Sequence, residues 1–131
     1  MADYAPPVKD ISFTLRTISD IDAIVDLPAF AHVDADMVDG LLDEAARFFS
    51  EVIAPTNTIG DEIGARFVNG SVTTPDAFKP AWAKYVESGW GAVTGSPDFG
   101  GHGFPKTIGL AVSEMMTSAN LAFSLCPMLT G

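Results

Sequence analysis

Apolar residues recur every three or four positions along most of this chain, which is the spacing of amphipathic α-helices. The clearest pattern predicts a helix from about Asp36 to Ala54, with Asp34 or Asp36 as its N-cap. Pro55 lacks a backbone donor, so it should end or kink this helix, with residues 57–64 continuing the pattern. The stripe expected to face the core consists of Met37, Leu41, Ala45, Phe48 and Val52, widened by Leu42 and Phe49.

Two further helices are predicted nearer the C-terminus. One extends from about Pro75 to Ser88, with Thr74 as its N-cap and Gly89 at the position that stops it. Its apolar face consists of Phe78, Trp82, Tyr85 and Val86. The other follows Pro105, and its apolar face consists of Ile108, Val112, Met115, Met116 and Ala119. A last apolar run, residues 121–129, closes the chain.

The remaining segments predict smaller elements. Asn69 and Gly70 supply the two positive-φ residues of a type I′ turn, so residues 66–73 should form a β-hairpin. Asp10 should cap a short helix whose apolar face consists of Ile11, Leu15 and Ile18. The segment that contains this helix has few apolar residues, so residues 1–33 are expected to form an arm against a helical domain of residues 34–131.

The charge of the chain limits its partners. It has 131 residues and a formal net charge of −10, which makes nucleic acid and anionic lipid poor partners. Its longest apolar run is too short to span a membrane, which needs about 20 residues. The single cysteine, Cys126, cannot form an internal disulfide, and its apolar surroundings predict a buried, inert thiol. With no signal-peptide pattern, a cytoplasmic protein is the simplest interpretation.

The polar motifs do not define a reaction by themselves. Residues 100–103, Gly-Gly-His-Gly, lack the last glycine of a dinucleotide fingerprint and the surrounding βαβ unit, so they predict a structural turn. His32 and His102 are not accompanied by a carboxylate cluster, so no metal site is expected, although His102 is the better functional candidate of the two. Cofactor-binding, metal-binding and catalytic residues are therefore not assigned.

The apolar C-terminal run leaves several interpretations open. The chain can be part of a longer protein, which would cover this run with other residues. It can instead be a helical interaction protein that dimerises through its apolar C-terminus. A third alternative is a lipid-binding module, which would have a pocket without chemistry.

The order of the motifs resembles that of the acyl-CoA dehydrogenase family. The similar segments are residues 45–55, Gly89-Trp90, the loop of residues 97–103, and a helix that carries Glu114. Three other segments resemble the larger members, of the methylthiopropanoyl-CoA dehydrogenase type: residues 2–4, 66–70 and 114–124.

The resemblance implies a mostly α fold, namely the N-terminal helical domain of such an enzyme with one small hairpin, apparently truncated. The complete enzyme would use FAD for α,β-dehydrogenation of an acyl-CoA substrate, pass electrons to electron-transferring flavoprotein and form a homo-oligomer. Its flavin and catalytic base would lie outside this chain, so FAD should not bind the chain alone and Glu114 is not assigned as the base. What carries over is an acyl pocket lined by Phe123, Ser124, Pro127 and Met128.

Overall fold

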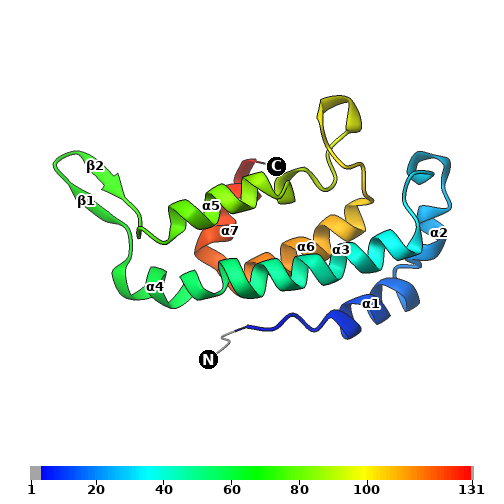
Figure 1. Ribbon diagram of the computed structural model, residues 1–131, viewed down its shortest axis with the longest axis horizontal. Coiled ribbons are helices and arrows are strands. Elements are labelled where there is room, and N and C mark those ends of the chain that lie inside the picture. The colour runs from blue at the N-terminus through cyan, green and yellow to red at the C-terminus, as the bar shows by residue number, and fades with distance from the viewer. Residues whose placement is uncertain (1–3, 131) are drawn as a thin grey trace.

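The computed structural model describes residues 4–130, so residues 1–3 of the predicted arm, with the motif at residues 2–3, and Gly131 lie outside the described part. The fold is helical with one small antiparallel hairpin, as predicted (Figure 1). Its longer helices are α1 (Val8–Thr17), α3 (Ala35–Phe48), α4 (Pro55–Ile63), α5 (Phe78–Glu87), α6 (Lys106–Ala119) and α7 (Leu121–Thr130). The short elements are α2 (Ile21–Val25), η1 (Pro28–Phe30), η2 (Phe49–Ile53), β1 (Arg66–Val68), β2 (Ser71–Thr73), η3 (Trp90–Ala92) and η4 (Pro97–Phe99).

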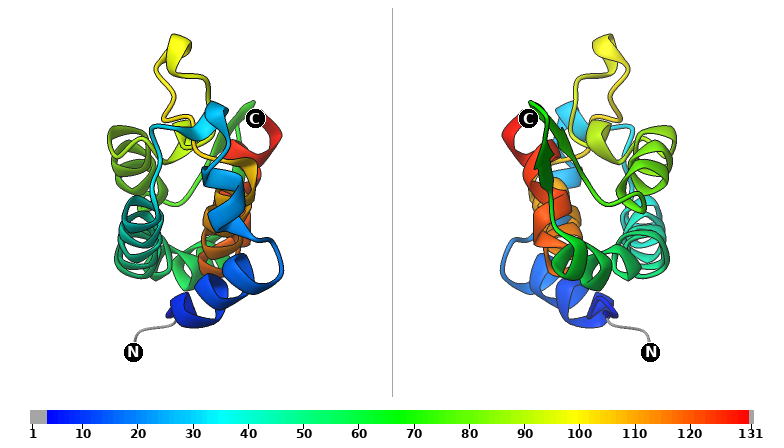
Figure 2. Two further views of the ribbon diagram at one scale, coloured as in Figure 1. Left: turned by 90° about the vertical axis from the view of Figure 1, so that its right-hand side faces the viewer. Right: turned by 90° about the vertical axis from the view of Figure 1, so that its left-hand side faces the viewer.

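The end-on views show two groups of helices around one core. α3 and α5 lie on one side and α6 and α7 on the other, with α1 along the lower edge (Figure 2). Contacts join α6 to α3 and to α7, and α7 to α4. The buried apolar residues form a single cluster that includes residues of the predicted arm.

A continuous helical segment extends from α3 through η2 into α4, which confirms the predicted continuation past Pro55 (Figure 1). The Asp34 carboxylate accepts a hydrogen bond from the Met37 N–H at 2.8 Å, so the predicted N-cap is also confirmed. η2 is a π-helical turn, in which the Ala54 N–H bonds to the Phe49 carbonyl five residues back at 2.8 Å. Pro55 has no N–H to continue the α-helical ladder, and this wider turn precedes it.

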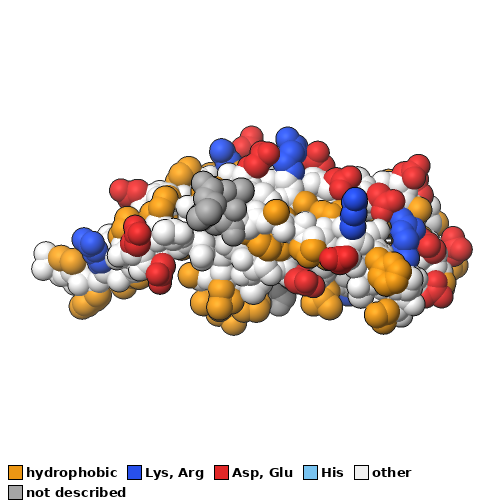
Figure 3. Space-filling view, turned by 90° about the horizontal axis from the view of Figure 1, so that it is seen from below, with side chains coloured by type: hydrophobic (Ala, Val, Ile, Leu, Met, Phe, Trp, Pro, Cys, Tyr) orange, Lys and Arg blue, Asp and Glu red, His pale blue; other side chains and the backbone are white. Residues whose placement is uncertain are grey.

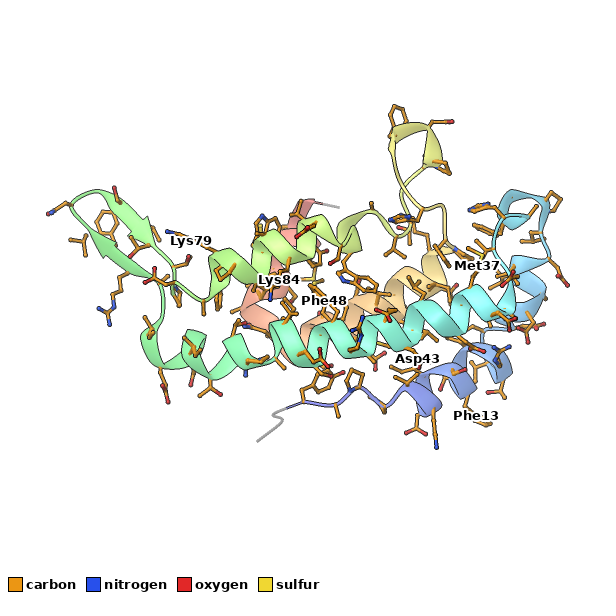
Figure 4. The ribbon with its side chains drawn as sticks, in the orientation of Figure 1. Phe13, Met37, Asp43, Phe48, Lys79 and Lys84 are labelled. Carbon is orange, nitrogen blue, oxygen red and sulfur yellow. The ribbon has the colours of Figure 1, made fainter. Side chains whose placement is uncertain are left out.

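The predicted core face of α3 is confirmed in part, because Ala45 and the widening residues Leu42 and Phe49 are buried. The buried residues are Val38, Leu42, Ala45, Phe49 and Ile53, whereas Met37 is exposed and Leu41, Phe48 and Val52 are half-buried. Two apolar stripes lie side by side on this helix, and the neighbouring helices α1 and α6 determine which one is covered. Phe48 points between α3 and α5 (Figure 4).

α5 begins later than the sequence predicts. Its N-cap residue is Ala77, while the Phe78 N–H bonds to the Pro75 carbonyl in a preceding turn, so Thr74 does not cap the helix. Ala81 and Tyr85 face the core, and the predicted core residues Trp82 and Val86 are exposed. The predicted stop is confirmed, because Gly89 has the positive φ of +74° typical of that position.

The arm packs on α3 through α1. Ile11 and Leu15 are buried as predicted, but Ile18 is 78% exposed because it lies at the C-cap, beyond the last helical turn. Asp10 is also not the N-cap, since the helix begins at Val8 and Asp10 lies in its first turn. Phe13 lies on the side of α1 that faces away from α3 (Figure 4).

One arginine ties the arm to the long helix. The Arg16 guanidinium donates to the Asp22 carboxylate at 2.7 Å and to the Asp39 carboxylate at 2.9 Å. The hydrogen bond and charge of Asp39, followed by the charge of Asp22, raise the pKa of Arg16. This ion-pair cluster links α1, α2 and α3 at the surface.

The hairpin forms as predicted. Asn69 and Gly70 have φ values of +50° and +79°, as a type I′ turn requires, and Phe67 pairs with Val72. Both strands are exposed, and the hairpin projects from one end of the molecule (Figure 1).

Candidate acyl-chain groove

A groove of about 430 Å³ lies between α5, η3, α6 and α7. Pockets for small molecules typically have about 300–1,000 Å³, so its size suits an elongated ligand. Its apolar and aromatic lining includes Trp82, Tyr85, Trp90, Leu110, Val112, Met116, Pro127 and Met128. Polar side chains on its wall are Thr94, Lys106, Ser113 and Thr117.

The four residues predicted to line the acyl pocket divide into two pairs. Pro127 and Met128 lie on the wall of the groove. Phe123 and Ser124 are buried one turn earlier in α7 and do not line this groove. The Ser124 hydroxyl donates to the Leu121 carbonyl at 2.8 Å, so it is used within its own helix.

Phe123 instead supports the aromatic wall from behind. Its ring centroid lies 5.8 Å from those of Trp82 and Tyr85 and 6.2 Å from that of Phe78. Trp82 and Tyr85 stack with centroids 5.5 Å apart. Aromatic pairs in this range contribute about 0.5–1.5 kcal/mol beyond burial, so α7 is anchored to α5 by this cluster.

The Tyr85 hydroxyl is in an environment that disfavours its ionisation. Burial raises the pKa of Tyr85, and the charge of a Cys126 thiolate would raise it further. Cys126 itself is exposed, so the predicted burial of its thiol is wrong.

Trp90 is a wall residue that sequence reasoning does not assign to the site. Its ring centroid lies 5.6 Å from those of Phe48 and Phe49, so η3 is held against the long helix. Its Nε1–H is the one buried side-chain polar group without a hydrogen-bond partner among residues 4–130. The sequence signal that could have found it is the Gly89-Trp90 pair, because a tryptophan directly after a helix stop has to pack against a neighbouring element.

Among the described residues, Lys106 is the only cation on the groove wall. Its ammonium group donates to the Thr94 hydroxyl at 3.1 Å, which joins the start of α6 to the segment after η3. Gly109 lies close to the same threonine, because a Cβ added there would be 2.3 Å from the Thr94 Cγ2 atom. The groove therefore has one local positive charge in a chain whose formal net charge is −10, and Figure 3 shows acidic side chains spread over one face of the molecule.

The glycine-rich loop is a rigid turn, as predicted. The N–H groups of Gly101, His102 and Gly103 bond to the carbonyls of Ser96, Ala92 and Gly95, at 2.9–3.0 Å. A Cβ on Gly101 would lie 2.1 Å from the Gly95 carbonyl oxygen, so the backbones touch there. Because the loop uses these amides internally, they do not form a cradle for the diphosphate of a flavin.

The two histidines are brought together by the fold. The His32 Nε2–H lies 3.2 Å from the His102 carbonyl oxygen, which ties the arm to the glycine-rich loop. The His102 ring packs beside Gly89. Within the described part of the chain, no group of three or more His, Cys, Asp or Glu side chains is placed to hold a metal ion. Between residues 4 and 130, no helix has the length and apolar character needed to cross a membrane.

Known proteins similar to this chain share one activity class. A 3-methylmercaptopropionyl-CoA dehydrogenase of Ruegeria pomeroyi is 39% identical over 127 residues, which are 97% of this chain and 22% of that protein. A butyryl-CoA dehydrogenase of Syntrophomonas wolfei is 31% identical over 98% of this chain and 22% of its own length. A broad-specificity linear acyl-CoA dehydrogenase of Mycobacterium tuberculosis is 29% identical over 93% of this chain and 20% of its own. No family model matches the chain.

These likenesses extend over nearly the whole helical domain. By this homology the chain belongs to the acyl-CoA dehydrogenase family. It spans about a fifth of the length of these relatives.

Proposed function

We propose that this chain is the N-terminal helical part of a flavin-dependent acyl-CoA dehydrogenase and that its groove holds part of the acyl chain. The observation that carries the proposal is the 39% identity over 97% of the chain to an acyl-CoA dehydrogenase. The groove supports it physically, because its aromatic and aliphatic wall residues suit an alkyl chain.

In such an enzyme this chain would bind part of the alkyl chain and exclude water from it. Pro127 and Met128 would contact the alkyl chain directly, opposite the ring of Trp82. Phe123 and Ser124, predicted as ligand contacts, would act from behind this wall. The flavin and the base that removes the α-proton would belong to the rest of the enzyme, so this chain has no catalytic role for Glu114, which is exposed.

The wider setting follows from the same proposal. The complete enzyme would be a cytoplasmic homo-oligomer that oxidises an acyl-CoA to its α,β-unsaturated thioester and delivers electrons to electron-transferring flavoprotein. An interaction protein that pairs through its apolar C-terminal helix is the second candidate, because Leu121, Leu125 and Leu129 of α7 are all exposed.

The first test uses the full-length product of the gene that encodes this chain. Acyl-CoA substrates of increasing length should bleach its flavin absorbance. Met128→Trp should lower kcat/KM for the longest substrates by about tenfold relative to the shortest, because lost methylene contacts are each worth about 1–3 kcal/mol. Leu129→Trp is the matched control, since Leu129 lies on the same helix but does not line the groove.

Two results would contradict the proposal. One is a coding sequence that ends directly after the codon for Gly131, combined with concentration-dependent dimerisation of the 131-residue chain. That pair of findings favours the interaction protein. The other is a full-length enzyme in which Met128→Trp and Leu129→Trp both leave the bleaching of the flavin the same for every length of the acyl chain.

A further inference from the structure

A chain of buried hydrogen bonds joins the kink of the long helix to the start of α7. The Asn120 side-chain NH₂ donates to the Thr56 hydroxyl oxygen at 2.9 Å, and the Thr56 hydroxyl donates to the Ile53 carbonyl at 2.6 Å. Asn120 is 1% exposed and Thr56 is 5% exposed. Residues 56 and 120 are far apart in sequence, so this pair is a tertiary link between α4 and the α6–α7 junction.

Asn120 uses both ends of its amide group. Its oxygen accepts the Phe123 N–H at 3.0 Å, which is the bond of an N-cap residue to the third residue of its helix. Its backbone is extended, with φ of −161° and ψ of +101°, as a residue between two helices requires. A serine can also cap a helix, but its side chain is too short to reach Thr56 as well, so the pair of bonds is specific to an amide of this length.

Thr56 also satisfies a backbone carbonyl at the kink of the long helix. Pro55 disrupts the helical ladder here, and the Asn57 N–H bonds to the Ala54 carbonyl instead of to Ile53. The Ile53 carbonyl therefore receives the Thr56 hydroxyl. A buried polar group without a partner costs about 1–3 kcal/mol, so the kink needs this hydroxyl, and the hydroxyl in turn offers its lone pair to Asn120.

The link lies directly behind the groove wall. α7 leaves Asn120, places Phe123 in the aromatic cluster, and one turn later places Pro127 and Met128 on the wall. We propose that Asn120, held by Thr56, is a positioning residue that fixes the direction of α7 and so sets the width of the groove for an alkyl chain. This inference rests on the proposed acyl-chain function, and it assigns no contact between Asn120 and the ligand.

The experiment measures binding of a series of saturated acyl-CoA esters, from short to long, to the 131-residue chain through the fluorescence of Trp82 and Trp90, which line the groove. Asn120→Ser keeps the cap and removes the link. Thr56→Val keeps the shape of Thr56 and removes its hydroxyl. Each should change the ratio of long-chain to short-chain affinity by roughly tenfold, because displacements of about 1 Å have effects of this order or larger.

Two conservative variants serve as controls. Thr56→Ser keeps the hydroxyl and should restore the wild-type ratio. Ser124→Ala removes a buried hydroxyl of α7 that bonds only within its helix, so it should leave the ratio unchanged. The double variant Asn120→Ser with Thr56→Val should have the ratio of either single variant, because both remove the same link.

A second readout is independent of the ligand. Relative to wild type, Asn120→Ser or Thr56→Val should each accelerate backbone hydrogen exchange in α7 more than in α6. Thr56→Ser should have the wild-type exchange rates. Wild-type chain that binds none of the esters would show that the groove of the 131-residue chain does not hold an acyl chain by itself, and hydrogen exchange would then decide the role of Asn120. Folded variants with wild-type α7 exchange, or with an unchanged affinity ratio in a binding-competent chain, would overturn the role of Asn120.

Discussion

α6 and α7 are consecutive and both apolar, yet the fold treats them differently. α6 buries Ile108, Ala111, Val112, Met115, Met116 and Ala119, and Leu110 is its one exposed large apolar side chain. α7 buries Phe123 and Ser124, while Leu121, Leu125, Met128 and Leu129 are exposed. The position of each helix explains the difference, because α6 contacts α3, η2 and α7, whereas α7 lies outside α6 (Figure 2). Apolar content thus identifies a helix that can be buried, and its neighbours determine how much of it is covered.

The largest expected effect tests this contrast directly. Met115 is fully buried in α6, so Met115→Ala should lower the free energy of unfolding by about 2–5 kcal/mol through lost burial and a residual cavity. Leu121→Ala on α7 should change it by no more than about 0.5 kcal/mol, because that side chain is exposed. Urea titration of both variants provides the measurement. Equal losses would mean that α7 is covered in solution, for example by a second copy of the chain.

A glycine pair sharpens the description of α6. A Cβ on Gly109 would lie 2.3 Å from the Thr94 Cγ2 atom, so Gly109→Ala should destabilise the fold by about 1–3 kcal/mol as the loop moves away. Gly40 lies within α3, and a Cβ added there would have no other atom within 4 Å. Gly40→Ala should therefore stabilise the fold by about 0.5–1 kcal/mol, the usual gain of alanine over glycine in a helix.

Thermal or urea unfolding of the two alanine variants tests the pair. Opposite signs are the expected outcome, and the Gly109→Ala variant should also weaken the link between Lys106 and Thr94 at the groove. Stabilisation by both substitutions to the same extent would show that the close approach of α6 to Thr94 does not exist in solution.

The contrast between the helices also explains what the sequence predicts well. Local chemistry is readable: Asp34 caps α3, Asn69-Gly70 turns the hairpin, and Gly89 stops α5. The core face of α6 is readable too, because its other side is mostly polar, with Leu110 as the exposed exception. On α3 the prediction is right for Leu42, Ala45 and Phe49. The rest of the predicted stripe is exposed or half-buried, since adjacent positions such as Leu41 and Leu42 are both apolar.

The groove required the tertiary structure. Pro127 and Met128 come from the family resemblance, and their place on the wall agrees with that prediction without testing ligand contact. The sequence assigns Trp82 to a core face, but it lies on the groove because α7 covers only part of α5. The link between Thr56 and Asn120 has no sequence pattern, because it depends on how the kink and the α6–α7 junction meet.

The smallest expected effect concerns the inner side of α7. Burial raises the pKa of Tyr85 above its usual value of about 10, and a Cys126 thiolate raises it further. A raised pKa in the folded state gives stability that is complete below about pH 10 and is lost as the pH rises through the folded-state pKa. The difference in unfolding free energy between wild type and Tyr85→Phe should therefore shift against the wild type as the pH rises above about 10.

Urea titrations of both proteins across this pH range measure that difference, in which other titrating groups cancel. Cys126→Ser keeps the burial of Tyr85 and removes the thiolate charge, so it should reduce the pH-dependent loss in part. Unchanged pH dependence in Tyr85→Phe would mean that α7 does not shield the Tyr85 hydroxyl in solution. The inner side of α7 would then be as open as its outer side, and the contrast with α6 would be greater than the structure shows.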